Sequence, residues 1–335
     1  MSVELLWEGS LWANWLEYSV ASDLDRPAAA FAFRARPRGD ISTPATPGGS
    51  IEARVDGETV LWGLVESVTT RRTADSVELE VAGRDAGGLL LTASSDPTWR
   101  WRRQSLSSIA STVCTYAGVP AEPVLDFDPT VSQGKAEPGE SCWATLQRLA
   151  ESEGMRLWIE PSGALHVGQW VSYAEPRGEL RRRRAAARRE NNIITSSVTR
   201  AFETSWSEVT VWAERGSGGG HAHWTGSWVD TTAPFYRPLV VVAGEVRNQA
   251  GADAAASVAG VQAQRDRFRA SYEVRGHLDA SGLAWAPNTI VQVTDEDEAI
   301  DRRLVVVGRT LSLSKEKGTR TELRLAVPEG EVIGG

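Results

Sequence analysis

Short segments in which apolar and polar residues alternate fill the first 95 residues of the chain. They are AAAFAFRAR (28–36), SIEARVDGETVLWGLVESV (50–68) and SVELEVAG (76–83). The middle segment contains Asp56-Gly57, a dipeptide typical of tight β-hairpin turns. Because period-two alternation is typical of half-buried strands, the pattern predicts a small β-barrel or sandwich here.

The period of the pattern changes after Ser95. Two segments place their apolar residues on one helical face, and each begins at a serine and ends near a glycine: SLSSIASTVCTYAGV (105–119) and SCWATLQRLAESEG (141–154). The alternating run MRLWIEPSGALHVGQW (155–170) predicts a hairpin that turns at Pro-Ser-Gly. Residues 96–175 therefore indicate a compact α+β unit.

The second half of the chain predicts a basic linker, more strands and one further helix. The segments are LRRRRAAARRENN (180–192) as the linker, strand-like alternation in 192–216, a flexible loop GSGGGHAHWTGS (216–227), a buried-type strand RPLVVVAGEV (237–246) and an alanine-rich helix GADAAASVAGVQAQRDRFRASY (251–272). From the YEVRGHL segment to the end, the pattern predicts only strands and turns.

An internal echo links the two ends of the chain. Residues 51–83 run strand, acidic turn, strand, charged turn, strand, and residues 290–327 run the same way. We interpret the echo as two similar small β-barrels on one chain with other material between them. Three copies of such a chain would form a ring of six like modules, so a trimer could meet a true hexamer face to face.

Composition and charge narrow the class of protein. A chain of 335 residues suggests two to four domains, and 41% hydrophobic with 24% charged residues is ordinary for a globular protein. The net charge of −8 disfavours a nucleic-acid clamp. The start predicts no signal peptide, and no apolar run predicts a membrane span. Cys114 and Cys142 fall in predicted helices as small buried residues, with a disulfide between them left open.

Candidate chemical motifs each have a simpler structural interpretation. GRDAGG (83–88) lacks the spacing of a phosphate-binding loop, so we interpret it as a strand end with an Arg84–Asp85 pair at a domain junction. HAH (221–223) offers two imidazoles where a metal site needs three or four ligands. DEDE (295–298) predicts a solvated acidic hairpin turn rather than a calcium loop.

The remaining acidic, histidine and arginine motifs do not indicate a particular chemical reaction. DFD (126–128) and ESEG (151–154) could serve as acid/base pairs, but no spacing rule selects them. His166 and His277 have no nucleophile nearby in sequence. The arginines at 181–184 and 188–189 favour a linker that contacts an acidic surface within its own assembly, because no aromatic residues are interleaved with them.

The order of these motifs resembles the baseplate hub proteins of contractile-tailed phages, the Mu-type tail hub and its relatives in tailocins and other contractile injection systems. The resemblance rests on VAGRDAGGLLLTAS, the helix of 105–119, residues 139–168, RPLVVVAGEV, the Ala/Arg helix, GLAWAPNTIVQVTDE (282–296) and GTRTELRLAVPE (318–329).

The resemblance implies a function. It implies a non-enzymatic homotrimer without cofactors, a pseudo-sixfold ring that joins the hexameric tail tube to the trimeric central spike and contacts other baseplate proteins. DNA would pass through its channel without specific binding. The location would be the virion tail baseplate, assembled in the host bacterial cytoplasm, with no stable membrane insertion.

Together with the sequence patterns, the resemblance implies the predicted fold class. This class is α+β, mainly β, with two small β-barrel domains, an inserted α+β domain and a helix-containing linker domain. The predicted boundaries are 1–95 for the first barrel, completed by 190–235, then 96–189 for the inserted domain with the basic linker, 236–285 for a strand-helix-strand domain and 286–335 for the second barrel. Predicted structural junction residues are Gly83, Arg84 and Asp85 where the first barrel ends, and Trp285, Pro287 and Asn288 where the second begins.

Two rival functions belong to other classes. A baseplate-associated peptidoglycan hydrolase would need a catalytic carboxylate in a cleft. A carbohydrate-binding module would use exposed tryptophans such as Trp224 and Trp228 as stacking platforms.

Two structural expectations follow from the preferred interpretation. Leu323, Leu325 and Val327 should face the core of the second barrel, and Glu322, Arg324 and Ala326 the other side. The channel wall should be acidic or neutral so that DNA slides freely, with the 295–298 turn as a candidate for its rim. Arg181–Arg184 should then lie away from the channel, against an acidic neighbour or solvent.

Overall fold

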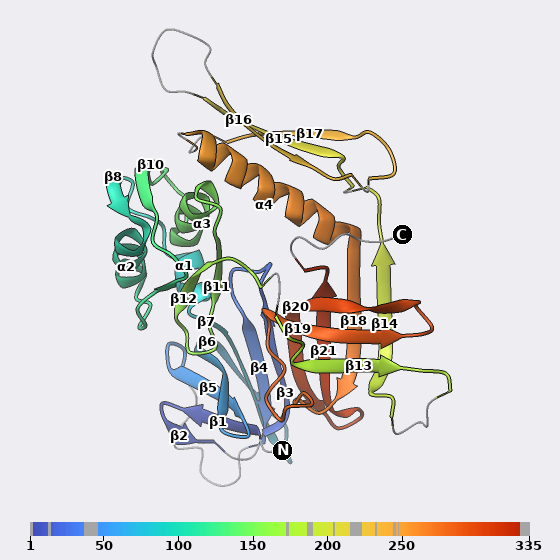
Figure 1. Cartoon of the computed structure of the whole chain (residues 1–335). Coiled ribbons are helices and arrows are strands. Elements are labelled where there is room, and N and C mark those ends of the chain that lie inside the picture. The colour runs from blue at the N-terminus through green and yellow to red at the C-terminus, as the bar shows by residue number, and fades with distance from the viewer. Residues whose placement is uncertain are drawn as a thin grey trace.

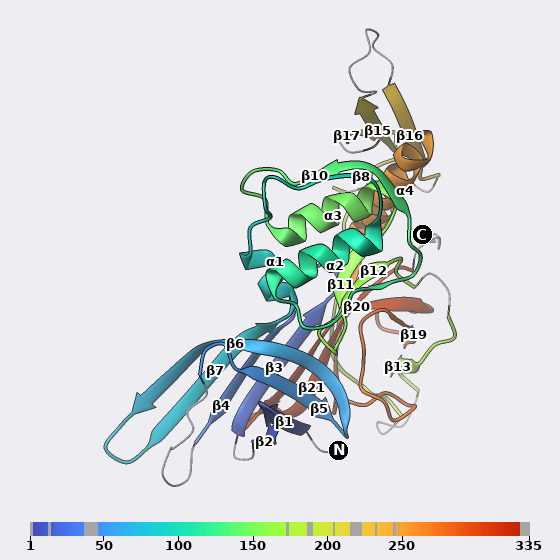
Figure 2. The ribbon, with the colours of Figure 1, turned by 90° about the vertical axis from the view of Figure 1, so that its left-hand side faces the viewer.

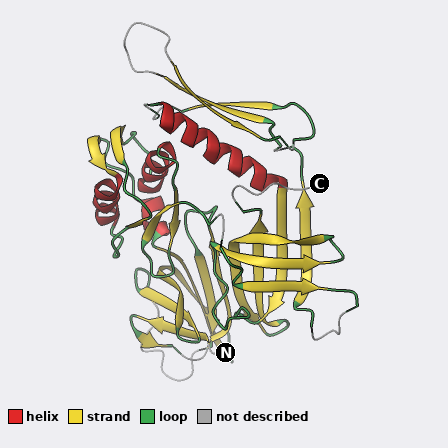
Figure 3. Cartoon of the chain, viewed as in Figure 1, coloured by secondary structure: helices red, strands yellow, loops and turns green. Residues whose placement is uncertain are grey.

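The protein is mainly β, with strands in two side-by-side groups and helices gathered above them (Figures 1 and 3). This computed structural model describes residues 3–12, 15–36, 46–171, 174–185, 190–203, 205–214, 223–231, 233–243, 246 and 248–328. The α+β, mainly β class predicted from the sequence is confirmed.

The first strand group, here called the N-terminal module, is built from hairpins. Its strands are β1 (Val3–Trp7), β2 (Ser10–Leu11), β3 (Trp15–Asp23), β4 (Ala30–Ala35), β5 (Ser50–Val55), β6 (Glu58–Arg72) and β7 (Val77–Asp85). They pair in the order β3-β4-β7-β6-β5-β1-β2. Alternate residues such as Phe31, Phe33, Leu79 and Val81 form the core, as the period-two pattern predicts.

The second strand group, the C-terminal module, collects strands that are distant in sequence. Its strands are β13 (Gly178–Arg182), β14 (Ile193–Arg200), β18 (Phe268–Arg275), β19 (Thr289–Asp295), β20 (Ile300–Ser314) and β21 (Gly318–Ala326). They pair in the order β14-β18-β21-β20-β19-β13. Leu323, Leu325 and Val327 lie in its core, whereas Ala326 belongs to another cluster and Glu322 is exposed, so the predicted facing is confirmed.

The two modules are parts of one sheet. The distal half of β20 pairs with β3, from Gly308↔Asp23 to Leu313↔Tyr18. The 13-stranded sheet that results has an open strand order, and no closed sheet is found in the part of the chain that the structure describes. The sequence predicted two small β-barrels; the described strands form two linked modules in which barrel closure is not found.

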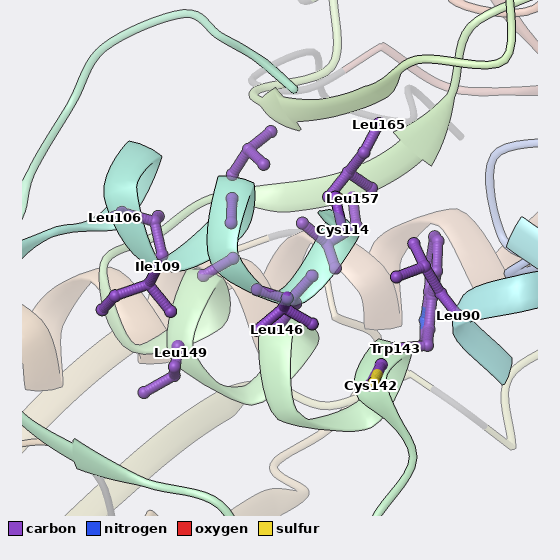
Figure 4. Packing of buried hydrophobic residues seen from close by; sticks show 14 of the residues in the cluster. Leu90, Leu106, Ile109, Cys114, Cys142, Trp143, Leu146, Leu149, Leu157 and Leu165 are labelled. Atoms are coloured by element: carbon purple, nitrogen blue, oxygen red, sulfur yellow. The ribbon is translucent and has the colours of Figure 1, made fainter. Parts of the chain in front are cut away.

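An inserted unit follows β7 and carries the largest cluster of buried hydrophobic residues in the described part of the chain. It contains α1 (Gly87–Thr92), β8 (Arg100–Ser105), α2 (Leu106–Ala117), β9 (Val124–Leu125), β10 (Thr130–Lys135), α3 (Cys142–Ser152), β11 (Arg156–Ile159) and β12 (Leu165–Gly168). Ser105 and Ser141 cap α2 and α3 by accepting backbone N–H groups, as predicted. Leu90, Ile109, Leu146 and Leu149 meet between the helices (Figure 4). Cys114 and Cys142 are buried free thiols.

The remaining elements form a small unit outside the large sheet (Figure 1). Strands β15 (Glu208–Glu214), β16 (His223–Val229) and β17 (Pro238–Val242) pair in the order β16-β15-β17, and α4 (Gln249–Arg267) packs on one face of them. The prediction of a buried strand at 237–246 is wrong, because β17 is an edge strand whose Val240 and Val242 are exposed.

Three further expectations are corrected by the strand pairing. The helix expected to reach residue 272 ends at Arg267, because Phe268, Ala270, Tyr272 and Val274 alternate into the core as β18. Residues 180–182 of the expected basic linker belong to strand β13 (Gly178–Arg182). Residues 190–235 do not complete the N-terminal module: β14 pairs with β18, and β15 and β16 belong to the separate small sheet.

Candidate functional surface: the polar face of the large sheet

Eight neighbouring strands share one continuous face that carries almost only polar or small side chains. The strands are β14, β18, β21, β20, β3, β4, β7 and the distal half of β6. Their opposite sides supply the two module cores. We call the first surface the polar face; its residues include Thr195, Ser197, Thr199, Ser271, Glu273, Glu322, Arg324, Thr310, Ser312, Glu17, Ser19, Ala32, Arg34, Glu78, Glu80, Ala82, Ser67, Thr69 and Arg71.

Carboxylates pair with many arginines of the polar face. The ion pairs are Arg34–Glu17 at 3.1 Å, Arg36–Glu78 at 2.7 Å, Arg71–Glu80 at 3.5 Å, Arg320–Glu273 at 3.5 Å, Arg84–Glu66 and Arg324–Asp23. Those pairs that are exposed to solvent add little stability. Their effect is on the surface potential, because a guanidinium held by a carboxylate is a poorer ligand for phosphate. The polar face is therefore close to neutral.

The polar face is hollowed where the two modules meet. A depression of about 480 Å³ is lined by strands of both modules, with Glu17, Arg34 and Glu80 from the N-terminal module and Ser312 and Ser314 from the C-terminal module. The polar face therefore runs across the joint between the modules without interruption.

On the core side, a hydrogen-bonded chain crosses the same joint. The His277 imidazole lies 2.5 Å from the Tyr18 hydroxyl of β3 through Nε2, and 2.9 Å from the Thr321 hydroxyl of β21 through Nδ1. Burial lowers the pKa of His277 to about 4, so its neutral form bridges the modules at neutral pH. Burial also raises the pKa of Tyr18 above its usual value.

Arg309 of β20 is the main polar residue of the joint. It is buried, and its guanidinium donates to the Val60 carbonyl at 2.7 Å, to Ser22 Oγ at 3.1 Å and to the Trp285 carbonyl. Burial lowers the pKa of Arg309 to about 10, which leaves it a cation at neutral pH. One side chain of the C-terminal module thus binds two strands of the N-terminal module, β3 and β6.

The structure brings three of the six predicted junction residues to one small cavity. Asp85, Pro287 and Asn288 line a cavity of about 110 Å³, together with Arg309. Asp85 accepts backbone N–H groups from Ala29 and Gly87, both at 2.9 Å. Burial is the main cause that raises the pKa of Asp85, to about 7.

The other junction residues lie near this cavity without lining it. Gly83 is required by close packing, because a Cβ there would lie 2.0 Å from the Leu64 carbonyl oxygen. Arg84 pairs with Glu66 on the polar face. Trp285 is buried in the C-terminal core, and its backbone N–H donates to the His277 carbonyl at 2.9 Å. Asn288 Oδ1 accepts the Val171 N–H at 2.8 Å.

The basic segment contacts the acidic turn of the same chain. Arg182 lies 3.7 Å from the Asp295 carboxylate, and Arg184 lies 2.9 Å from that of Asp297. Arg181 pairs with Glu179. The expectation that Arg181–Arg184 lie against an acidic neighbour is confirmed for these three residues; the neighbour is Glu179 for Arg181 and the 295–298 turn for Arg182 and Arg184. Residues 188–189 lie outside the described part of the chain.

Other motifs are accounted for by packing. Asp126 accepts from the Gln169 N–H at 2.9 Å and contacts His166, and Asp128 accepts the Ser107 N–H at 2.9 Å at the start of α2. Trp228 packs on α4, because a Cβ at Gly260 would meet its ring at 2.0 Å. Trp224 packs against the cluster under β15, so neither tryptophan is an exposed stacking platform.

Two further results concern metals and membranes. His221 of the HAH motif lies outside the described residues, and among those described no group of three or more His, Cys, Asp or Glu side chains is arranged to hold a metal ion. Within the described ranges, no helix has the length and apolarity needed to cross a membrane.

Sequence reasoning missed Arg309 and the role of His277. A signal for Arg309 existed: it is the one charged residue within the run LVVVGRTLSL (304–313). A cation inside an apolar strand is costly to bury unless it is hydrogen-bonded, so its presence points to buried carbonyl partners. Those partners come from β6, Ser22 and Trp285, which no local pattern connects to β20.

The two modules also match each other in register, which a sequence echo alone could not establish. β6 and β20 are both 15 residues long, and β7 and β21 both 9. The β6–β7 pairing has a bulge between Val65 and Ser67, and the β20–β21 pairing has one between Val306 and Gly308. The orders β3-β4-β7-β6-β5 and β14-β18-β21-β20-β19 therefore correspond strand by strand.

Comparison with protein families covers most of the chain. Residues 2–85 match the family "Mu phage baseplate assembly protein GpP-like, N-terminal", residues 86–169 match "Baseplate hub protein gp44-like, second domain", and residues 263–327 match "Tail protein, C-terminal domain". The first boundary falls at Asp85, where β7 ends and the inserted unit begins.

Individual proteins are similar over nearly their full length. The baseplate hub protein gp44 of Escherichia phage Mu is 25% identical, over 99% of this chain and 89% of its own. A tail protein from Neisseria meningitidis MC58 superimposes with a TM-score of 0.84 at 29% identity, covering 97% of this chain and 96% of its own. The 43 kDa tail protein of prophage MuSo2 from Shewanella oneidensis shares the fold, with a TM-score of 0.81 at 21% identity over 98% and 99%.

Proposed function

Because the chain belongs to the Mu-type baseplate hub family of contractile-tailed phages, we propose that it is a non-enzymatic structural hub whose three copies form a ring of pseudo-sixfold symmetry. The duplicated strand order of the two modules carries this proposal. Two equivalent modules per chain give six in a trimer, which matches a sixfold partner on one face and a threefold partner on the other.

The partners of the ring follow from its two symmetries. We propose that the hexameric tail tube docks on the pseudo-sixfold face and that a trimeric central spike docks on the opposite face, with other baseplate proteins around the rim. The chain would then act in the tail baseplate of the virion, after assembly in the host bacterial cytoplasm. The names of the Mu and Neisseria proteins, a baseplate hub and a tail protein, support this location.

The polar face would line the channel of the ring. It is continuous across both modules, small or polar in its side chains, and its arginines pair with carboxylates. DNA would pass such a wall without specific binding, because few free cations are available to displace counterions from phosphates. The acidic turn at 295–298 is occupied by Arg182 and Arg184, so its role at the channel rim has no support.

The six junction residues would serve as structural supports within the ring. Asp85 holds the start of the inserted unit to β4 through Ala29 and Gly87. Trp285 and Asn288 hold the segment before β19 against Arg309 and Val171. In this proposal the domain boundaries predicted from the sequence keep their order, with the second module supplemented by β13, β14 and β18.

The number of copies tests the proposed function. Light scattering on the purified chain should give a mass of about 109 kDa, three times the 36.3 kDa of one chain. A stable monomer or dimer at micromolar concentration, with no trimer in the assembled particle either, would contradict it. A peptidoglycan zymogram separates the hydrolase rival, which predicts a cleared band where the hub predicts none.

Charge variants test the channel wall. The triple variant E17Q/E78Q/E80Q removes the carboxylates that hold Arg34, Arg36 and Arg71. We expect the trimer to gain salt-dependent affinity for short DNA duplexes, at least tenfold at low salt, because each freed cation adds a phosphate contact. An unchanged affinity would mean that the polar face lies away from the DNA path.

A further inference from the structure

Two strand edges of the large sheet have no partner among the described strands. β14 pairs with β18 on one side only. β5 pairs with β6 only as far as Leu64, so the stretch Ser67–Arg72 pairs with β7 alone. Figure 2 shows this distal part of β6 and β7 extending beyond the body of the N-terminal module. Unpaired edges invite pairing with another strand of matching shape.

The internal duplication shows what partner each edge fits. The bulges align Ser67 with Gly308, so Thr69 corresponds to Thr310 and Thr70 to Leu311. The β3–β4 pairing skips Leu16 and the β14–β18 pairing skips Ile194, which aligns β14 with β3. Leu16 and Ile194 are both exposed at these matching bulges. β6 is therefore the counterpart of β20, and β14 the counterpart of β3.

Within the chain, the distal half of β20 pairs antiparallel with β3, with Thr310 opposite Ala21 and Leu311 opposite Val20. We propose that the same pairing recurs between copies: the distal half of β6 in one copy pairs antiparallel with β14 of the next copy. The register transferred from the internal joint places Thr69 opposite Thr199 and Thr70 opposite Val198. The inference rests on the proposed ring, and it specifies which strands close that ring.

The side chains at both edges suit such a joint. Ser67, Thr69 and Arg71 of β6 would continue the polar face into Ser197 and Thr199 of the next copy. The edge sequences SVTT and TSSVT are rich in Thr and Val, which favour strands. The exposed Arg71 and Arg72 keep the edge soluble before assembly. The result is one closed sheet around the channel, made from three open ones.

A second copy is the only possible source of this pairing. β6 and β14 lie at opposite ends of the eight-strand path, seven strand spacings or roughly 34 Å apart measured along the sheet. A disulfide requires Cα atoms within about 7 Å. Any cross-link between the two edges must therefore join different copies.

Cysteine cross-linking tests the strands and the register together. The double variant T69C/T199C should give a covalent trimer on a non-reducing gel after mild oxidation. The control T69C/S197C keeps the same face but moves one cysteine two residues along, where cross-strand distances of about 7–8 Å are too long; we expect at least tenfold less product. Cys114 and Cys142 can remain, because both are buried and burial raises the pKa of both thiols.

Mixing the single variants T69C and T199C should give covalent pairs, whereas neither alone should. Light scattering on the same samples distinguishes a failure of the proposed strand pairing from a failure of the proposed ring. A trimer that yields no T69C/T199C product, or more product from T69C/S197C, overturns the strand pairing and leaves the ring standing. A chain that forms no trimer overturns both.

Discussion

The joint inside the chain and the edges outside it are built from equivalent strands with different side chains. At the internal joint, Leu311 opposes Val20 and Leu313 opposes Tyr18, and all four contribute to the N-terminal core. At the matching outer edges, the aligned residues are Thr70, Val198, Arg72 and Ser196. All four residues at the joint within the chain are apolar or aromatic, whereas three of the four at the edges that meet water before assembly are polar.

The internal joint and the outer edges also differ in the polar residues on their core side. Arg309 and His277 fix the internal joint by buried hydrogen bonds to Val60, Ser22 and Tyr18. The residue aligned with Arg309 at the outer edge is Val68, and the one aligned with Tyr18 is Ser196. A buried polar network specifies one partner and is costly to leave unsatisfied, so it suits a joint whose partner is covalently attached. The outer edges carry no counterpart of this network at the aligned positions.

The largest expected difference between the internal joint and the outer edge comes from placing a carboxylate at aligned positions of the two. Leu311→Asp buries an unpaired carboxylate in the core, which costs several kcal/mol, so we expect no soluble protein. Thr70→Asp, at the aligned position of the exposed edge, should fold normally and weaken only trimer formation. Soluble yield and light scattering measure the two effects. Equal behaviour of the two variants would remove the distinction between the joints.

A deletion of the buried guanidinium should be the next largest effect. Arg309→Ala leaves the Val60 and Trp285 carbonyls without their donor, and we expect a loss of about 3 kcal/mol or more in the free energy of unfolding. Its aligned partner Val68 is half-buried, so Val68→Ala should cost about 1 kcal/mol or less. Chemical denaturation measures both. A loss for Val68→Ala as large as that for Arg309→Ala would contradict the account.

Acid should weaken the internal joint. The pKa of His277 is lowered to about 4 in the folded protein, below its unfolded value of 6.5. The neutral imidazole therefore contributes stability above pH 6.5, and this contribution is lost as the pH falls towards 4, by up to about 3 kcal/mol. The variant His277→Gln should show a flatter stability profile across this range. A profile unchanged by the substitution would mean that His277 does not titrate in the joint.

The smallest expected effect concerns the register of the outer joint. In T69E/T199K, opposite charges would face each other across each joint of the ring, whereas in T69E/T199E like charges would. Each pair should differ by about 0.2–1 kcal/mol, so the first trimer should dissociate at a lower concentration than the second. The difference should shrink at high salt. Sedimentation at two ionic strengths measures it, and identical dissociation would argue against this register.

Local patterns predicted the elements whose partners are close in sequence. The capped helices α2 and α3, the β11–β12 hairpin and the facing of Leu323 and Leu325 are all confirmed, because each depends on periodicity and short turns. The echo between 51–83 and 290–327 is confirmed as the equivalent meanders β5-β6-β7 and β19-β20-β21.

Elements whose partners are distant were predicted less well. β18 carries the alternation of Phe268, Ala270 and Tyr272, but the preceding helical pattern continues into it without a glycine or proline. β14 was assigned to the wrong module because only its pairing with β18 reveals its place. Arg309 and His277 were missed for the same reason: their partners lie on strands more than 200 residues away or in the other module.

A reconstruction of the assembled baseplate tests the central claim most directly. The account predicts three copies of this chain around one axis, the polar face turned toward the channel, and Thr69 of each copy opposite Thr199 of the next, with their Cα atoms about 5 Å apart. A ring in which β6 and β14 of neighbouring copies do not touch, or in which the polar face points outward, would contradict it.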